Sequence, residues 1–437
     1  MKKYLFLPVI LFLSLFLSAQ VYLPFKQIQN YTRNQKPNHY DSSLTYLTNR
    51  LGIEIHYLYP LYQAIGWEEK FKKKLGDKTF YDDFSQFLSF AGDYGMASEY
   101  VSKSFDALPD SIAKNLADAV GQLKDIQYAP AKTSILDNAE QYRVVMINED
   151  RAKPVHRAFT YSLLEDLYKE GYHYLAMEML NNLANHCLDS LNVFTGFYTN
   201  EPIAGELIRK ALQTGYTLVS YEDTLAYRHT NTQRDSIQAA NIYSVIKKDP
   251  SAKILVHAGS AHIGEEKTTG YIPMGYWFKK ISGIDPFTVE QTSLTEGSNF
   301  EYGKLFYEYF TSKFSITEPS VIFQNKRSLN PFGAKGYDII VVHPPTLYKN
   351  NRPSWLSLGG DRQPVLIQPT ERSLFFVQAY YENEYQADKL KFLVPADQTY
   401  IANSDGYYCL YLRKGRYKIV LRDIGYKILS TKDMEVK

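Results

Sequence analysis

Acidic and imidazole side chains stand at the ends of several short apolar runs in this sequence. Five such runs lead into a carboxylate or an imidazole, at Glu149, Glu178, Glu222, His257 and His343. Polar residues often follow strands, so each one alone is also explained as an ordinary strand end. The ends of parallel strands meet at one edge of a sheet, where α/β proteins bind ligands. The set therefore favours a shared polar cleft.

Four further residues close to these positions have side chains that support chemistry. His262 follows Gly259 in a Gly-x-x-His motif, where the glycine permits a tight turn. His156 stands at the start of an expected helix. It is interpreted either as a base or ligand, or as an ordinary exposed residue. Arg234 would bind a carboxylate or an oxyanion through paired hydrogen bonds, or would simply pair with an acid. Asp235 is a partner for these groups or an acid near a helix N-terminus. We expect Glu149, Glu178 and His262 to share the cleft.

Carboxylates and imidazoles in one cleft permit two kinds of chemistry. Burial and mutual charge move their pKa values toward neutrality, which suits general acid and base catalysis. The same groups bind divalent zinc, manganese or iron. The sequence has no Gly-x-Ser-x-Gly elbow, no His-x-x-x-His spacing and no glycine-rich phosphate loop. It therefore does not predict an ordinary serine hydrolase, a zinc protease of that kind or a nucleotide-dependent enzyme.

The pattern of apolar runs and amphipathic segments predicts the elements that carry these residues. The expected strands are Val144–Ile147, Tyr174–Met177, Thr217–Ser220, Ile254–Val256, Phe287–Val289, Val321–Phe323 and Ile339–Val342. Helix-like segments such as "VHRAFTYSLLEDLYKEG" and "AGELIRKALQTG" lie between them, and both end in glycine, as helix C-caps often do. We therefore predict an α/β fold with a mainly parallel sheet flanked by helices.

The chain divides into four expected parts. Residues 1–20 read as a secretory signal peptide, with two lysines, an apolar run from Tyr4 to Leu17 and small residues before the cleavage point. Residues 21–135 are expected to be a linker to about residue 40 and then a helical region. Residues 136–345 form the α/β core, and 346–437 a small β-rich appendage. The protein is therefore expected to be exported, to the periplasm or outside the cell.

The composition of the chain bears on whether it binds nucleic acid, spans a membrane or forms a disulfide. The 437 residues carry a formal net charge of +2, which argues against nucleic acid as a partner. No apolar stretch after the signal reaches the length of a membrane span, so no integral membrane segment is expected after signal removal. In an exported protein the only two cysteines, Cys187 and Cys409, could pair, although their spacing alone does not show it.

Four motifs occur in an order that resembles one known superfamily. The stretch "INEDRAKPVHRAFTYSLLEDLYKEGYHYLAMEML" contains an apolar strand that ends in Glu149, a histidine, a helix and a second strand that ends in Glu178. "RDSIQAANIY" and "GSAH" follow. Residues 143–345 are similar to the superfamily that includes erythromycin esterases, ChaN-like haem-binding lipoproteins and TraB/Tiki-type metalloproteases. Two departures are Asn148 in place of a glycine, and Arg151 near the position of an expected histidine.

The resemblance implies a hydrolase that acts on an ester, lactone or amide through Glu/His acid-base chemistry. It implies catalytic roles for Glu149, His156, Glu178, Arg234, Asp235 and His262, supported by His257 and Glu222. The small-molecule substrate stays open, and so does the cofactor: a divalent metal or haem is possible, and neither is required for hydrolysis. A guanidinium at Arg151 would lower the pKa of Glu149 and repel a metal cation. The alternatives are a haem- or iron-binding protein and a non-catalytic member.

Overall fold

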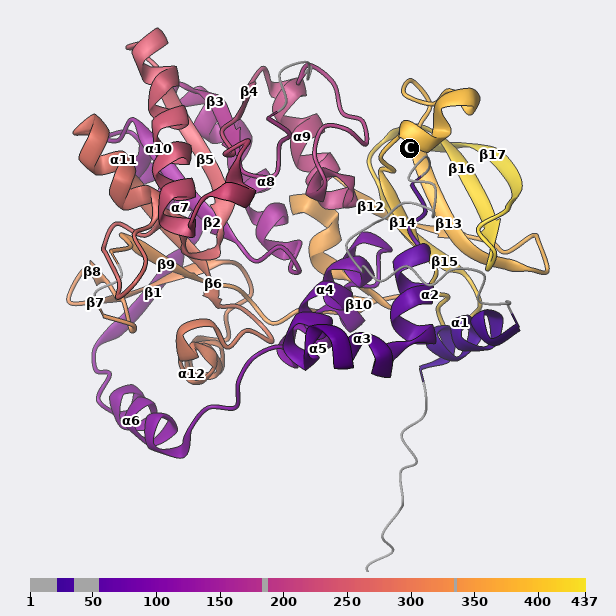
Figure 1. The fold of residues 1–437 in the computed structure, drawn as a ribbon, viewed down its shortest axis with the longest axis horizontal. Coiled ribbons are helices and arrows are strands. Elements are labelled where there is room, and N and C mark those ends of the chain that lie inside the picture. The colour runs from indigo at the N-terminus through magenta and orange to yellow at the C-terminus, as the bar shows by residue number, and fades with distance from the viewer. Residues whose placement is uncertain (1–21, 35–54, 183–187, 334–335) are drawn as a thin grey trace, which may run out of the picture.

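The computed structural model describes residues 22–34, 55–182, 188–333 and 336–437. It shows a mixed α/β protein whose central sheet is mainly parallel and flanked by helices (Figure 1). Helices precede this layer in the chain, and antiparallel β-sheets follow it. The predicted fold class is therefore confirmed. The expected signal peptide at residues 1–20 and Cys187 lie outside the described residues, so the export and disulfide predictions stay predictions.

The central sheet has the strand order β1-β7-β9-β6-β2-β5-β3-β4, with β8 paired to β7. Its strands are β1 (Ile126–Pro130), β2 (Val144–Glu149), β3 (Tyr172–Met177), β4 (Thr217–Ser220), β5 (Lys253–Gly259), β6 (Phe287–Leu294), β7 (Ser320–Gln324), β8 (Arg327–Ser328) and β9 (Ile339–Val342). The pairs from β9 through β6, β2, β5 and β3 to β4 are parallel, while β7 is antiparallel to both of its neighbours.

Helices cover both faces of this sheet because its central strands are apolar on both sides. In β2, Val145 and Ile147 face one core cluster, with α7, α8 and α9, whereas Val144 and Met146 face another, with α10 and α11. A third cluster joins α12 to β6, β7 and β9. These helices are α7 (Ala131–Ala139), α8 (Val155–Lys169), α9 (Pro202–Thr214), α10 (Asn231–Lys248), α11 (Met274–Ser282) and α12 (Lys304–Phe314).

The N-terminal part is helical, as predicted, with two corrections. Its helices are α1 (Leu23–Asn34), α2 (Tyr59–Gly66), α3 (Glu68–Leu75), α4 (Asp77–Phe90), α5 (Tyr94–Ser102) and α6 (Asp110–Gly121). The predicted linker is wrong at residues 23–34, because α1 buries Ile28 in the aromatic core of this region. The expectation of helix throughout residues 41–135 is wrong at β1, which forms the edge of the central sheet beside β7.

The C-terminal part is a small antiparallel β structure, as predicted. One sheet has the order β14-β13-β16-β17 and a second pairs β12 with β15. The strands are β12 (Gln363–Ile367), β13 (Leu374–Tyr381), β14 (Asp397–Thr399), β15 (Tyr408–Leu412), β16 (Gly415–Asp423) and β17 (Ile428–Val436); a short hairpin, β10 (Tyr348–Lys349) and β11 (Arg352–Pro353), precedes them. Side chains of both sheets share one apolar core, which gives a sandwich.

The N-terminal helices and the C-terminal sheet also share a core. Phe375, Phe376 and Tyr400 pack in the same cluster as side chains of α2 and α4. The fully buried guanidinium of Arg352 donates to the Gly92 carbonyl (2.6 Å) at the end of α4 and to Asp397 (2.6 Å) in β14. The two ends of the chain therefore stabilise each other. Within the described ranges, no helix is both long enough and apolar enough to cross a membrane.

Candidate functional site

Three glutamates lie at the carboxyl ends of neighbouring parallel strands. Glu149 ends β2, Glu178 follows β3, and Glu222 lies two residues after β4. Together with Gly259, the last residue of β5, they line a cavity of about 530 Å³. The other lining residues are Asp82, Asp150, Arg151, Met179, Tyr198, Arg234, Ser260 and Phe300. The expectation that strand ends bring these acids to one edge of the sheet is confirmed for the three glutamates.

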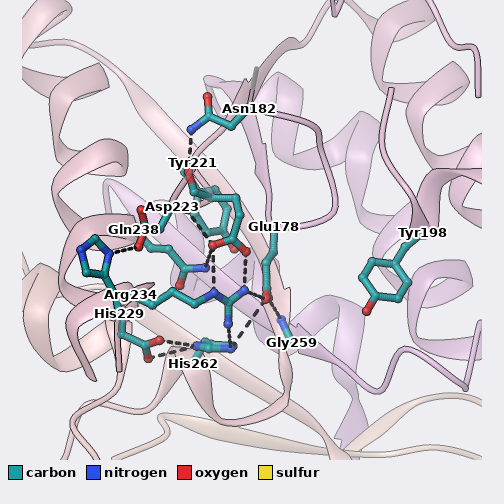
Figure 2. A network of polar contacts seen from close by, with 12 residues as sticks. Glu178, Asn182, Tyr198, Tyr221, Asp223, His229, Arg234, Gln238, Gly259 and His262 are labelled. Atoms are coloured by element: carbon teal, nitrogen blue, oxygen red, sulfur yellow. Dashed lines mark hydrogen bonds and ion pairs between the residues drawn. The ribbon is translucent and has the colours of Figure 1, made fainter. Parts of the chain in front are cut away.

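Arg234 is the centre of the polar network in this cavity (Figure 2). It projects from the first turns of α10, whose N-terminus is fixed by a capping box between Thr230 and Gln233. Its Nη2 donates to Glu178 Oε1 (2.5 Å) and to Glu222 Oε2, and its Nε donates to Glu222 Oε1 (2.9 Å). The arginine therefore holds two carboxylates from adjacent strands in fixed positions.

His262 is oriented by a buried carboxylate. It lies in a 3-10 turn, η3 (Ser260–Ile263), directly after β5. Its Nδ1 is hydrogen-bonded to Oδ2 of the fully buried Asp235 at 3.0 Å. The same oxygen accepts hydrogen bonds from the Tyr271 hydroxyl (2.5 Å) and the Met274 N–H (2.9 Å). Because Asp235 accepts the proton on Nδ1, the lone pair of the neutral imidazole is on Nε2.

The opposite ring nitrogen faces the cavity network. His262 Nε2 lies 3.2 Å from Arg234 Nη1 and 3.6 Å from Glu178 Oε1. Glu178 also accepts a hydrogen bond from the Gly259 N–H at 2.6 Å (Figure 2). The predicted convergence is thus seen for five residues: Glu178, Glu222, Arg234, Asp235 and His262. The arrangement presents an imidazole nitrogen next to a carboxylate and a guanidinium.

Charge and burial set the ionisation of the central pair. Burial alone lowers the pKa of His262, but the charge of Glu178 and the hydrogen bond to Asp235 outweigh it, so the pKa is raised above the ordinary 6.5. Burial raises the pKa of Glu178, but His262, Arg234 and the Gly259 N–H reverse this, and its pKa is lowered. Glu178 is therefore a carboxylate at neutral pH, and its charge favours the protonated form of His262.

Glu149 lines the same cavity but belongs to a second, deeper network. Its two oxygens accept from Arg157 Nε (2.7 Å) and Nη2 (3.1 Å), and the same guanidinium donates to Glu201 (3.1 Å). His257 Nε2 lies 3.0 Å from Glu149 Oε2. Burial opposes ionisation, but Arg157 and His257 outweigh it and lower the pKa of Glu149 to about 2.

The charges that lower the pKa of Glu149 are those of Arg157 and His257, whereas the sequence analysis named Arg151. Arg157, six residues further along the chain, lies on the buried face of α8 and contacts Glu149 there. The Arg151 guanidinium instead pairs with Asp82 and, at 3.6 Å, with Asp83, both on α4. It links the N-terminal helices to the mouth of the cavity.

Two predicted histidines lie away from the cavity. His156 has no solvent exposure, and its Nδ1 accepts a hydrogen bond from the Asp150 N–H at 2.9 Å. Its ring packs near that of His343, whose Nε2 lies 3.0 Å from Gln291 Oε1. Burial lowers the pKa of both, for His343 to about 3, so both are neutral. The predicted catalytic role of His156 and the cleft position of His343 are not supported by this placement, since α8 and β6 bury both rings.

His257 has a supporting position, as predicted. It is buried within β5 rather than at its end, between Glu149 and Thr160, whose Oγ1 lies 3.2 Å from His257 Nδ1. Glu222 is closer to the centre than predicted, because it binds Arg234 through both oxygens. The sequence analysis gave it only a supporting role.

Three groups of the site were missed by the sequence analysis. Arg157 was not considered, although a charged residue among Ala158, Phe159 and other apolar residues of α8 signals a buried counter-charge. Tyr271 and the backbone N–H of Gly259 have no sequence signal, because only the folded chain brings them to Asp235 and Glu178.

The site does not fit a metal ion or haem. Within the part of the chain that the structure describes, no group of three or more His, Cys, Asp or Glu side chains is placed to hold a metal. Glu178 and Glu222 are already bound to Arg234, whose charge would repel a cation. His156, which the sequence offered as a base or a ligand, has no exposed surface to present to a porphyrin.

Comparison of the chain with protein-family models, curated proteins and solved structures found no match. The resemblance of residues 143–345 to the erythromycin esterase superfamily therefore stays a prediction.

Proposed function

We propose that this protein is an exported hydrolase that acts on an ester, lactone or amide. The observation that carries the proposal is the line of contacts from Asp235 through His262 to Glu178 at the wall of the cavity. An imidazole fixed by a buried carboxylate on one nitrogen, with its other nitrogen next to a carboxylate that lines the cavity, is an arrangement that suits a general base. Export rests on the signal-like residues 1–20 alone.

In this mechanism His262 activates water. A water on the cavity side contacts Nε2, gives its proton to that nitrogen, and its oxygen bonds to the carbonyl carbon of the substrate. The bond from that carbon to the leaving oxygen or nitrogen then breaks, and the imidazolium returns the proton to the leaving group. Asp235 stabilises the imidazolium through Nδ1–H, and Glu178 adds a negative charge near Nε2.

The other charged groups position this pair. Arg234 keeps Glu178 and Glu222 in place and prevents their mutual repulsion from moving them. Its Nη1, 3.2 Å from His262 Nε2, donates to the lone pair of the neutral ring, which holds the ring in its base form until water replaces that contact. Glu149 is a positioning residue, because Arg157 and His257 occupy its oxygens.

The test is turnover of a panel of nitrophenyl esters by the purified protein. The proposal expects hydrolysis by the wild type and a loss of at least about 100-fold in kcat/KM for His262→Ala. His173→Ala, which alters an exposed histidine near the start of β3, is the matched control and should retain full activity. Absence of turnover by folded wild-type protein, or equal turnover by His262→Ala, would overturn the proposal.

A non-catalytic binding protein is the second candidate, and one observation favours it. Arg234 already donates hydrogen bonds to Glu178 and Glu222, so both carboxylates have a partner without a substrate. Such a protein would bind a small ligand in the cavity with no turnover, and His262→Gln would change the affinity for that ligand without changing any reaction rate.

A further inference from the structure

A second hollow adjoins the polar cavity and shares a wall with it. Its volume is about 600 Å³, and Glu178, Met179, Tyr198 and Glu222 line both spaces. The rest of its wall is largely apolar, and we call this space the apolar annex, defined by Met179, Leu180, Val193, Phe194 and Phe197. A ligand that contacts Glu178 from the polar cavity can therefore extend into the apolar annex, because the two spaces share that residue.

Two aromatic rings of the annex are exposed to solvent although they are held in place. Phe194 is 59% exposed and Phe197 is 39% exposed. Phe197 packs against Phe90 of α4 with ring centroids 5.6 Å apart, and Phe194 packs against Phe392 at 5.5 Å. Exposed rings fixed by neighbours favour contact with an apolar ligand, because little side-chain freedom is lost when they bind one.

The charges of the polar cavity define the other end of such a ligand. Five carboxylates and two guanidiniums line it, and the acids are Asp82, Glu149, Asp150, Glu178 and Glu222. Asp150 is 4% exposed, and its Oδ2 has no hydrogen-bond partner among the described residues. This excess of negative charge repels anions, while Asp150 leaves one acceptor available to an N–H or O–H donor.

We propose that the substrate is an ester or amide of an apolar acyl or aryl group whose polar end carries no negative charge. The apolar group lies in the annex, and the scissile carbonyl lies at the shared wall next to Glu178, whose Oε1 is 3.6 Å from His262 Nε2. This inference rests on the proposed function for the reaction, but binding of the apolar group does not depend on turnover.

The experiment has two parts, turnover and binding. Uncharged nitrophenyl esters from acetate to octanoate are hydrolysed by the wild type and by Phe194→Ala. Each methylene that the annex covers should raise kcat/KM about threefold, so octanoate should exceed acetate by well over tenfold. Phe194→Ala should remove most of that gain, and Phe194→Leu should restore part of it. Leu366→Ala, which removes an exposed apolar side chain of β12 outside the annex, is the control.

Binding is measured with the uncharged fluorescent probe N-phenylnaphthylamine and the His262→Ala variant. Saturable probe binding that Phe194→Ala weakens at least threefold would support the annex as a binding surface. If no ester is turned over in the first part, the same result would overturn the proposed hydrolase activity. Turnover that is independent of chain length, or a preference for esters with a carboxylate near the scissile bond, would overturn the inference and leave the hydrolase in place. Probe binding that Phe194→Ala does not alter would also overturn the inference.

Discussion

Replacement of Arg157 by methionine should destabilise the protein by several kcal/mol, in a way that depends on pH. Methionine keeps much of the side-chain volume but removes the guanidinium that joins the buried Glu149 and Glu201. Removal of one partner from a buried ion pair costs about 3–5 kcal/mol. The pKa of Glu149 gives a similar figure, since about 2 instead of the ordinary 4.5 corresponds to about 3 kcal/mol.

The pH dependence follows from the sign of each pKa change. In the wild type the lowered pKa of Glu149 contributes stability above about pH 4.5, and this contribution is lost as the pH falls toward 2. Without Arg157, burial raises the pKa of Glu149 above its unfolded value. The variant therefore loses stability as the pH rises above about 4.5, and the difference between the two proteins is largest near pH 7.

Urea unfolding, followed by circular dichroism at pH 7, 6 and 5, measures this difference. Arg151→Met is the matched control, because the Arg151 side chain is 39% exposed and its ion pairs with α4 should be worth less than about 1 kcal/mol. A difference below about 1 kcal/mol for Arg157→Met, or one that does not change with pH, would refute the assignment of Arg157 as the counter-charge of Glu149.

Three further predictions concern other parts of the molecule. Arg352→Met should cost about 3–5 kcal/mol, measured by urea unfolding, because it removes the buried partner of Asp397; a neutral result would contradict the shared core. A chain truncated after residue 345 should fail to give a cooperative thermal transition, because Phe375 and Phe376 complete the aromatic core of the N-terminal helices. Arg234→Met should lower kcat/KM at least about tenfold and Arg234→Lys less, because methionine frees both glutamates; equal rates would exclude this positioning role.

Most of the central sheet could be predicted because its strands are buried on both faces. Such strands are continuous apolar runs, and the predicted bounds of Thr217–Ser220 and Ile339–Val342 agree with β4 and β9. The first run was expected to end at Ile147, but β2 continues through Asn148 and Glu149. Both polar residues are buried, because Ser260 and Arg157 supply their hydrogen bonds.

What could not be predicted depends on contacts between distant parts of the chain. The sequence of β1 has no pattern that predicts a strand. It is a strand because it pairs antiparallel with β7, nearly 200 residues later. α1 is amphipathic but short, and its burial depends on the core that it shares with the C-terminal sheet.

Dependence on distant contacts also explains which site residues could be predicted from the sequence. The strand rule places Glu149, Glu178 and Glu222 correctly because it depends only on local pattern and parallel topology. It cannot say that the imidazole of His156 points into the interior, which follows from the way α8 packs on the sheet.

The most direct test of the account is the pH dependence of kcat/KM for wild type and Asp235→Asn. If neutral His262 is the base, the wild-type rate rises with pH through a pKa above 6.5 and then levels off. The hydrogen bond to Asp235 raises that pKa, so Asp235→Asn should move the inflection to lower pH and reduce the plateau rate. A profile with the same inflection in both proteins, or no titration above pH 6, would contradict the claim that Asp235 and His262 act as one unit.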